Sequence, residues 1–180
     1  FIKSSDFILI SIIIFGILID KINYLYSFYL PAWDQGYHLS NLFRTYNILE
    51  SININNNDWW HNIWTITDTY RGPLTYILSS IFLKIFGKSY ENSLLSNHIF
   101  IIITILCIFN LSEELGYKKA GLWGALIYAL NPYIFDQRVD YLIDISQVCF
   151  INLNYLLLYK FFKSKANFLL SFLLGITLGF

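Results

Sequence analysis

An aspartate follows the first apolar segment of the chain, in the stretch Pro-Ala-Trp-Asp-Gln-Gly-Tyr-His that ends at His38. A carboxylate at a membrane surface, flanked by aromatic residues and followed by an amphipathic helix, indicates chemistry on a lipid-borne substrate. Asp34 is therefore a candidate functional residue, and equally a candidate helix N-cap, a position that aspartate favours. His38 is within side-chain reach of Asp34 on a helix, although a single histidine near an interface is more often a hydrogen-bonded structural residue.

A second acidic cluster follows a later apolar segment and contains Asp136, Arg138, Asp140 and Asp144. Ionisable side chains at membrane depth are costly and are functional candidates by default. Asp144 begins the next apolar segment and is the deeper position, whereas Asp136 and Asp140 suit a solvated loop. Arg138 can pair with a neighbouring aspartate or hold a phosphate through two hydrogen bonds.

A third candidate, Arg71, lies just before Pro73, and proline is typical of a first helical turn. At the outer interface of a membrane an arginine meets lipid phosphates. Arg71 is therefore predicted either to bind a substrate phosphate or to anchor the following helix on lipid headgroups.

The composition is that of a membrane protein. Of 180 residues, 56% are hydrophobic and 13% are charged, against about 25% charged residues in soluble domains. The formal net charge is zero and no basic tract is present, so nothing indicates nucleic-acid binding. Cys107 and Cys149 lie in apolar runs, where we expect small buried hydrophobes and neither a disulfide nor a metal site.

A spanning helix needs roughly 20 mainly apolar residues. Five stretches reach or approach this length: residues 7–19, 94–111, 120–135, 143–162 and the run from 168 onward. A sixth stretch, residues 73–86, is shorter and contains Lys84.

The positive-inside rule decides how the short stretch is placed. If residues 73–86 do not span and the N-terminus is cytoplasmic, the short cytoplasmic loops hold five lysines: Lys118, Lys119, Lys160, Lys163 and Lys165. We therefore expect residues 73–86 to lie in, or dip into, the outer leaflet. The segment 20–92 and the loop 136–144 then share the non-cytoplasmic side.

Residues 34–50 show the periodicity of an amphipathic helix lying in the membrane plane. The apolar stripe is Leu39, Leu42, Phe43, Tyr46 and Leu49, and the polar stripe is Asp34, His38, Asn41 and Thr45. We expect the polar stripe to face a pocket, with Asp34 opposite Asp140 or Asp144.

The ordered set of motifs resembles the GT-C superfamily of membrane glycosyltransferases, specifically ArnT-like and protein-mannosyltransferase-like enzymes of glycosyltransferase family 39. The matching segments are 33–38 (WDQGYH), 70–74 (YRGPL), 86–89 (FGKS), 131–133 (NPY), 138–144 and 173–179 (LLGITLG). Two departures stand out: the family usually has Asp-Glu where this chain has Asp34-Gln35, and often Pro-Pro-Leu where it has Gly72-Pro73-Leu74. The first departure removes one carboxylate, so a role that needs only Asp34 survives.

The resemblance implies an all-α polytopic membrane protein: a GT-C-like transmembrane helix bundle with an amphipathic in-plane helix in the first outer loop. Residues 1–180 are then the N-terminal part of a single transmembrane glycosyltransferase domain, truncated at both ends. The implied reaction transfers a sugar from a polyprenyl-phosphate donor to an acceptor, with inversion, at the outer face of a multi-pass plasma-membrane protein.

For the site, the resemblance implies Asp34 as general base and Asp144 as a second catalytic acid. Substrate-binding positions are His38, Arg71, Arg138 and Asp140; whether Asp140 or Asp144 matches the second acidic position of the family stays open. The sequence names no cofactor, and a divalent metal is left open without an evident ligand cluster.

The partners expected are the lipid-linked donor, the bilayer, and a lipid, glycan or protein acceptor. Two other functions remain alternatives. A transporter or flippase would place acids near mid-bilayer, and a non-catalytic membrane scaffold would tolerate the missing second carboxylate.

Overall fold

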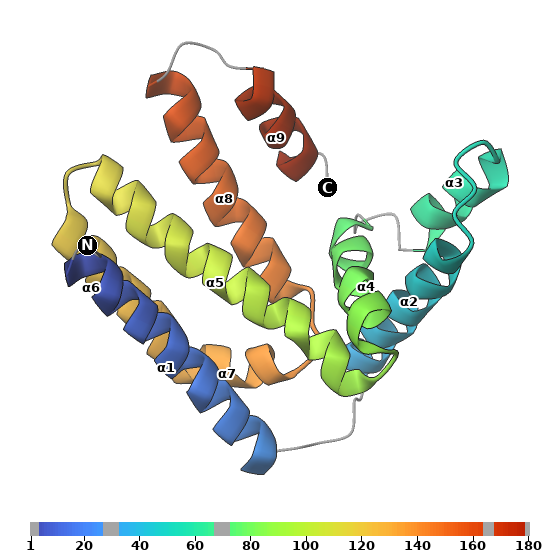
Figure 1. Ribbon diagram of the computed structural model, residues 1–180, viewed down its shortest axis with the longest axis horizontal. Helices are drawn as coiled ribbons and strands as arrows, with labels where there is room; N and C mark the ends of the chain where they lie inside the picture. The colour runs from blue at the N-terminus through green and yellow to red at the C-terminus, as the bar shows by residue number, and fades with distance from the viewer. Residues whose placement is uncertain (1–3, 27–32, 67–72, 164–167, 179–180) are drawn as a thin grey trace.

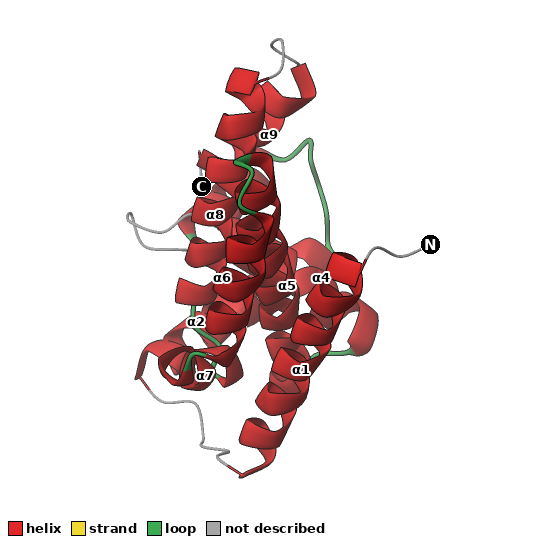
Figure 2. Ribbon diagram, turned by 90° about the vertical axis from the view of Figure 1, so that its left-hand side faces the viewer, coloured by secondary structure: helices red, strands yellow, loops and turns green. Residues whose placement is uncertain are grey.

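The computed structural model describes residues 4–26, 33–66, 73–163 and 168–178, and these ranges consist of helices joined by loops, with no strand among them (Figures 1 and 2). In chain order the helices are α1 (Ser4–Tyr26), α2 (Trp33–Glu50), α3 (Asn57–Thr65), α4 (Leu74–Phe86), α5 (Tyr90–Glu114), α6 (Lys118–Leu130), α7 (Pro132–Val139), α8 (Asp144–Lys163) and α9 (Phe168–Leu178). The predicted all-α fold is confirmed.

Two of the described helices, α1 and α5, are long and apolar enough to cross a membrane. They have 23 and 25 residues, which at 1.5 Å per residue gives about 35 and 38 Å, more than the roughly 30 Å of a hydrocarbon core. Helix α4 has 13 residues and is about 20 Å long. Its bounds agree with the predicted short stretch, and its length is below that of a spanning helix.

One predicted stretch, residues 120–135, is divided in the structure. Helix α6 ends at Leu130 and α7 begins at Pro132, with Asn131 in extended backbone between them. Proline has no N–H to donate and disfavours helical backbone in the residue before it, so it ends one helix and opens the next. The turn separates α7, which carries Arg138, from the apolar α6.

Helix α5 is central in the main body of the fold and packs against α4, α6 and α8 (Figure 1). Helix α1 lies in front of α6 in this view and contacts α5, α6 and α7. Its core is one cluster of buried apolar side chains: Leu9, Ile12, Phe100, Ile101, Ile105, Phe109, Ala125, Ala129, Ile145 and Cys149. At Gly121 a Cβ atom would lie 2.8 Å from Ser112 Cβ. Helices α5 and α6 therefore approach as closely as only a small residue allows, which is typical of membrane helix pairs.

A second apolar cluster joins α2 and α4 to the start of α5 and to the segment between α7 and α8. Its buried members are Leu42, Tyr76, Leu83, Leu94, Tyr141 and Ile143. This cluster attaches the α2–α4 pair to the main body at the end where α7 turns into α8.

Candidate active site

The predicted site residues fall on three parts of the fold. Asp34 and His38 are on the first turns of α2, Arg138 is in the last turn of α7, and Asp140 and Asp144 flank the connection into α8. The sixth residue, Arg71, lies outside the described residues.

His38 is buried between α2 and α4. Its Nδ1 atom lies 2.6 Å from the hydroxyl oxygen of Tyr76, and the two rings stack with centroids 6.0 Å apart. Asn41 and Thr45 are buried with it. The expectation that this polar stripe faces a pocket was wrong for these three residues, which are buried, and the Tyr76 hydroxyl on α4 is a hydrogen-bond partner of the buried imidazole.

Asp34 is exposed in the first turn of α2. The residue before it, Trp33, has a φ of 47°, a left-handed backbone conformation that a bulky L-residue rarely adopts. It is a feature of the Trp-Asp-Gln-Gly motif that the sequence alone did not reveal.

Helix α4 connects the two acidic regions through neighbouring side chains. Tyr76 bonds to His38 on α2, while the Thr75 hydroxyl lies 2.7 Å from that of Ser146 in the first turn of α8. The Ser146 hydroxyl also donates to the Ile143 carbonyl at 2.6 Å. One turn of α4 therefore holds both the helix that carries Asp34 and the helix that begins at Asp144.

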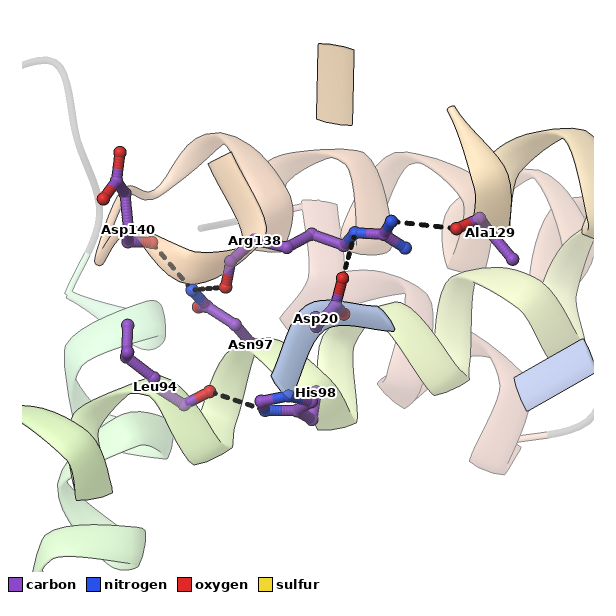
Figure 3. Close-up of polar contacts among 7 residues, drawn as sticks. All are labelled: Asp20, Leu94, Asn97, His98, Ala129, Arg138 and Asp140. Carbon is purple, nitrogen blue, oxygen red and sulfur yellow. Dashed lines mark hydrogen bonds and ion pairs between the residues drawn. The ribbon is translucent and has the colours of Figure 1, made fainter. Parts of the chain in front are cut away.

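Arg138 is buried, with 1% of its surface exposed, and is paired with a residue that the sequence analysis did not single out (Figure 3). Its Nε atom lies 3.1 Å from Oδ1 of Asp20 on α1, and its Nη2 atom donates to the Ala129 carbonyl at 2.8 Å. Asp20 is also 1% exposed. An aspartate near the end of an apolar helix was the signal for this pair, since a charge there requires a partner.

The backbone on either side of Arg138 is bonded to side chains of α5. Asn97 Nδ2 donates to the carbonyls of Arg138 at 3.2 Å and Asp140 at 2.9 Å, and the Tyr90 hydroxyl donates to the Val139 carbonyl at 3.4 Å. Side chains of α5 therefore donate hydrogen bonds to three consecutive backbone carbonyls, those of residues 138 to 140. Asp140 itself is half-buried and Asp144 is exposed.

A small cavity of about 60 Å³ adjoins the ion pair, between α1, α5 and the end of α7. Its lining includes two acids, two cations, a histidine and a tyrosine: Asp20, Glu91, Lys21, Arg138, His98 and Tyr24. The volume is enough for a few water molecules. In the apolar cluster with Tyr76, burial raises the pKa of the Tyr141 hydroxyl far above its ordinary value, so this tyrosine is uncharged at any working pH.

Within the described ranges, no group of three or more His, Cys, Asp or Glu side chains is placed to hold a metal ion. Cys107 and Cys149 are both buried with free thiols. The described residues therefore identify no ligand set for a divalent metal, as the sequence also identified none.

Comparison with known proteins gives one match. Residues 70–180, more than half of the chain, match the family model described as dolichyl-phosphate-mannose-protein mannosyltransferase. No curated protein and no solved structure matches the chain. The matched region contains Arg138 and Asp144, while Asp34 and His38 precede it. Because this match covers more than half of the chain, the chain belongs to the dolichyl-phosphate-mannose-protein mannosyltransferase family.

Proposed function

We propose that this chain transfers a sugar from a polyprenyl-phosphate donor to an acceptor at the non-cytoplasmic face of the plasma membrane. Family membership establishes a membrane glycosyltransferase in general terms; the donor, the face and the residue roles are our proposal. Residues 1–180 act in it as part of a single transmembrane catalytic domain. The acceptor, whether lipid, glycan or protein, contributes a hydroxyl or an amine.

The observation that carries the site is the connection through α4. Thr75 and Tyr76 are neighbours in the chain, and they bond to Ser146 and His38 respectively. The start of α8, with Asp144, and the start of α2, with Asp34, are thereby attached to the same turn. This arrangement supports a shared site for the two carboxylates.

In the proposed reaction the acceptor oxygen or nitrogen attacks the anomeric carbon of the donor sugar. The bond from that carbon to the phosphate oxygen breaks, the lipid phosphate leaves with the electron pair, and Asp34 takes the proton of the acceptor. A single displacement inverts the anomeric carbon and needs no covalent enzyme intermediate. Asp144 is the second catalytic acid, with Asp140 beside it.

Charge grows on the leaving phosphate, and a positioned cation stabilises it electrostatically. Arg71 is the first candidate for this role. His38 and Arg138 complete the proposed substrate-binding set, although both are already engaged, with Tyr76 and with Asp20. We propose that these two residues contact the substrate from the edge of a packed network while they keep those partners.

The proposed orientation is supported by where the lysines lie. Lys163 Nζ is 2.6 Å from Glu114 Oε2, and the Tyr159 hydroxyl donates to the Glu114 carbonyl at 3.1 Å, so the last turns of α5 and α8 meet. Lys118 opens α6 at the same end of α5. The network around Arg138 contacts the first turns of α5, at its opposite end. Positive-inside placement then puts the lysine end in the cytoplasm and the acidic segments outside.

Asp34→Asn in the full-length protein tests the proposal. Asparagine caps a helix nearly as well as aspartate, whereas removal of a positioned general base costs about 10²–10⁴ in rate. Membranes with the variant are expected to hold normal amounts of folded protein, to bind the polyprenyl-phosphate sugar, and to transfer almost none. Asp58→Asn, at an acidic position in the first turn of the exposed α3, is the matched control and keeps full activity.

Transfer by Asp34→Asn at the wild-type rate would remove Asp34 from the catalytic role and leave it as a cap. Movement of the lipid-linked sugar across the membrane without transfer to an acceptor would favour the flippase alternative.

A further inference from the structure

Arg138, Val139 and Asp140 form a segment that is held by three other helices. Helix α1 provides Asp20, α5 provides Asn97, and α6 provides the Ala129 carbonyl (Figure 3). Helix α5 also provides Tyr90. This segment leads directly into the connection between Asp140 and Asp144. Neither Asp20 nor Asn97 belongs to the catalytic or substrate-binding set named above.

We propose that Asp20 and Asn97 are positioning residues of the transfer reaction, which lock the 138–140 segment so that Asp140 and Asp144 are presented in one fixed geometry. The inference rests on the proposed function, because it assigns a role within that same site.

The ion pair with Asp20 holds the side chain of Arg138 in place. Asp20 and Arg138 are each 1% exposed, and their Oδ1 and Nε atoms are 3.1 Å apart. A buried charge without its partner is strongly unfavourable, so the two helices that carry the pair are held in one arrangement. The Nη2 bond to the Ala129 carbonyl, at 2.8 Å, ties the same guanidinium to the end of α6.

Asn97 holds the backbone of the 138–140 segment in place. One amide nitrogen donates to the carbonyls of Arg138 and Asp140, at 3.2 and 2.9 Å, so it spans the whole segment. The Asp140 carbonyl also accepts from the Leu142 amide at 3.0 Å, which closes the turn toward α8. A hydrogen-bonded turn of this kind defines where the next side chains point.

The direction of the two acids follows from what is buried beyond that turn. Tyr141 is 1% and Ile143 is 7% exposed, and both belong to the apolar cluster with Tyr76. With these two side chains in the core, the alternate residues Asp140 and Asp144 are left half-buried and exposed. Loosening the segment would turn the acids relative to Asp34 without removing any of them.

Catalysis is more sensitive to such a shift than substrate binding is. A displacement of about 1 Å, caused by a change away from the chemistry, can cost about 10²-fold in rate. Binding of a long lipid-linked donor is spread over many contacts. A positioning role therefore predicts a fall in kcat with little change in the donor KM.

The kinetic test uses Asp20→Asn and Asn97→Leu, singly and together, in the full-length protein in membranes. Each single variant is expected to lower kcat by about 10–100-fold, with the donor KM near wild type. The double variant is expected to be no slower than the slower single variant, since both release the same segment and residues of one network are not additive. Asp20→Glu, which keeps the charge, is expected to recover most of the activity.

A second readout does not depend on activity. Leu142 is half-buried beside the turn, and Leu142→Cys can be labelled with a membrane-impermeant maleimide after Cys107 and Cys149 are replaced by alanine. Asp20→Asn and Asn97→Leu are each expected to speed this labelling several-fold. Glu114→Gln breaks an exposed ion pair at the other end of α5 and is the matched control, with labelling and kcat unchanged.

Unchanged labelling at position 142 in both single variants overturns the proposal, and so do rate losses that multiply in the double variant. If Asp20→Asn reduces the amount of folded protein, Asn97→Leu carries the same test with the ion pair intact. Failure of the proposed function is distinguishable: it appears as absence of sugar transfer by the wild-type protein, while the labelling still reports whether the segment is held.

Discussion

His38 on α2 and Tyr76 on α4 are joined by a hydrogen bond of 2.6 Å between two buried side chains, His38 with 2% and Tyr76 with 1% of its surface exposed. The bond is the polar centre of the contact between α2 and α4. It turns a polar helix face, which would otherwise require water, into a packed interface.

Tyr76→Phe removes the hydroxyl and leaves the ring. His38 then loses this partner in a buried setting, which is expected to cost about 1–3 kcal/mol of stability. Thermal unfolding of the purified protein in detergent measures the loss. Tyr155→Phe, at a tyrosine that is 60% exposed, is the control and should leave the unfolding temperature unchanged. Equal unfolding temperatures for the two variants would contradict a structural role for the bond.

Gly121→Ala places a methyl group where a Cβ atom would be 2.8 Å from Ser112 Cβ and 3.1 Å from the Phe109 carbonyl oxygen. Because backbone on the facing helix cannot retreat easily, the variant is expected to lose about 1–3 kcal/mol through overpacking between α5 and α6. Gly175→Ala is the matched control, since a Cβ atom there has no neighbour within 4 Å. A destabilisation equal in both variants would show that the close approach is unimportant.

Asp144→Asn and Asp140→Asn decide which aspartate is the second catalytic acid. Asp144 is exposed in the first turn of α8, and Asp140 is half-buried before it. We expect Asp144→Asn to lower the transfer rate by about 10²-fold or more and Asp140→Asn to have the smaller effect. Initial rates with the polyprenyl-phosphate sugar provide the comparison, and the reverse order would assign the role to Asp140.

Topology is tested by cysteine labelling from each side of sealed vesicles. Trp33 is 96% and Tyr117 is 69% exposed, which makes these positions accessible to an impermeant reagent. Trp33→Cys and Leu142→Cys are expected to label from outside, and Tyr117→Cys and Lys163→Cys from inside. Labelling of positions 33 and 142 from opposite sides would mean that α4 crosses the membrane, and the shared site would then be impossible.

Local patterns were enough to predict most of the helices. The bounds of α2 and α4 follow the predicted stretches 34–50 and 73–86 closely, because apolar periodicity and Pro73 act over a few residues. The same patterns predicted α8 from its first residue, Asp144. Asn131-Pro132 predicted the end of the helix that begins near Ala120, and α6 does end at Leu130; the short helix α7 after Pro132 was not predicted.

What the patterns did not reveal is which side chains meet across helices. The polar stripe of α2 was expected to face a pocket, yet His38 is satisfied by Tyr76, a partner that no local pattern identifies. Likewise Arg138 was expected to pair with a neighbouring aspartate or a phosphate, and it pairs with Asp20 on α1. Amphipathicity predicts which residues share a face of a helix. It does not predict which hydroxyl or carboxylate from a distant segment will contact that face.

The pairing of Asp20 with Arg138 also constrains how the protein is made. Asp20 is synthesised early and Arg138 late, and at about 5–20 residues per second the interval between them is on the order of ten seconds. During that time α1 carries a carboxylate near its membrane end without the guanidinium that neutralises it, a costly state within a bilayer. The contact between α1 and α7 through this ion pair therefore forms late, because Asp20 has its partner only after Arg138 has been synthesised.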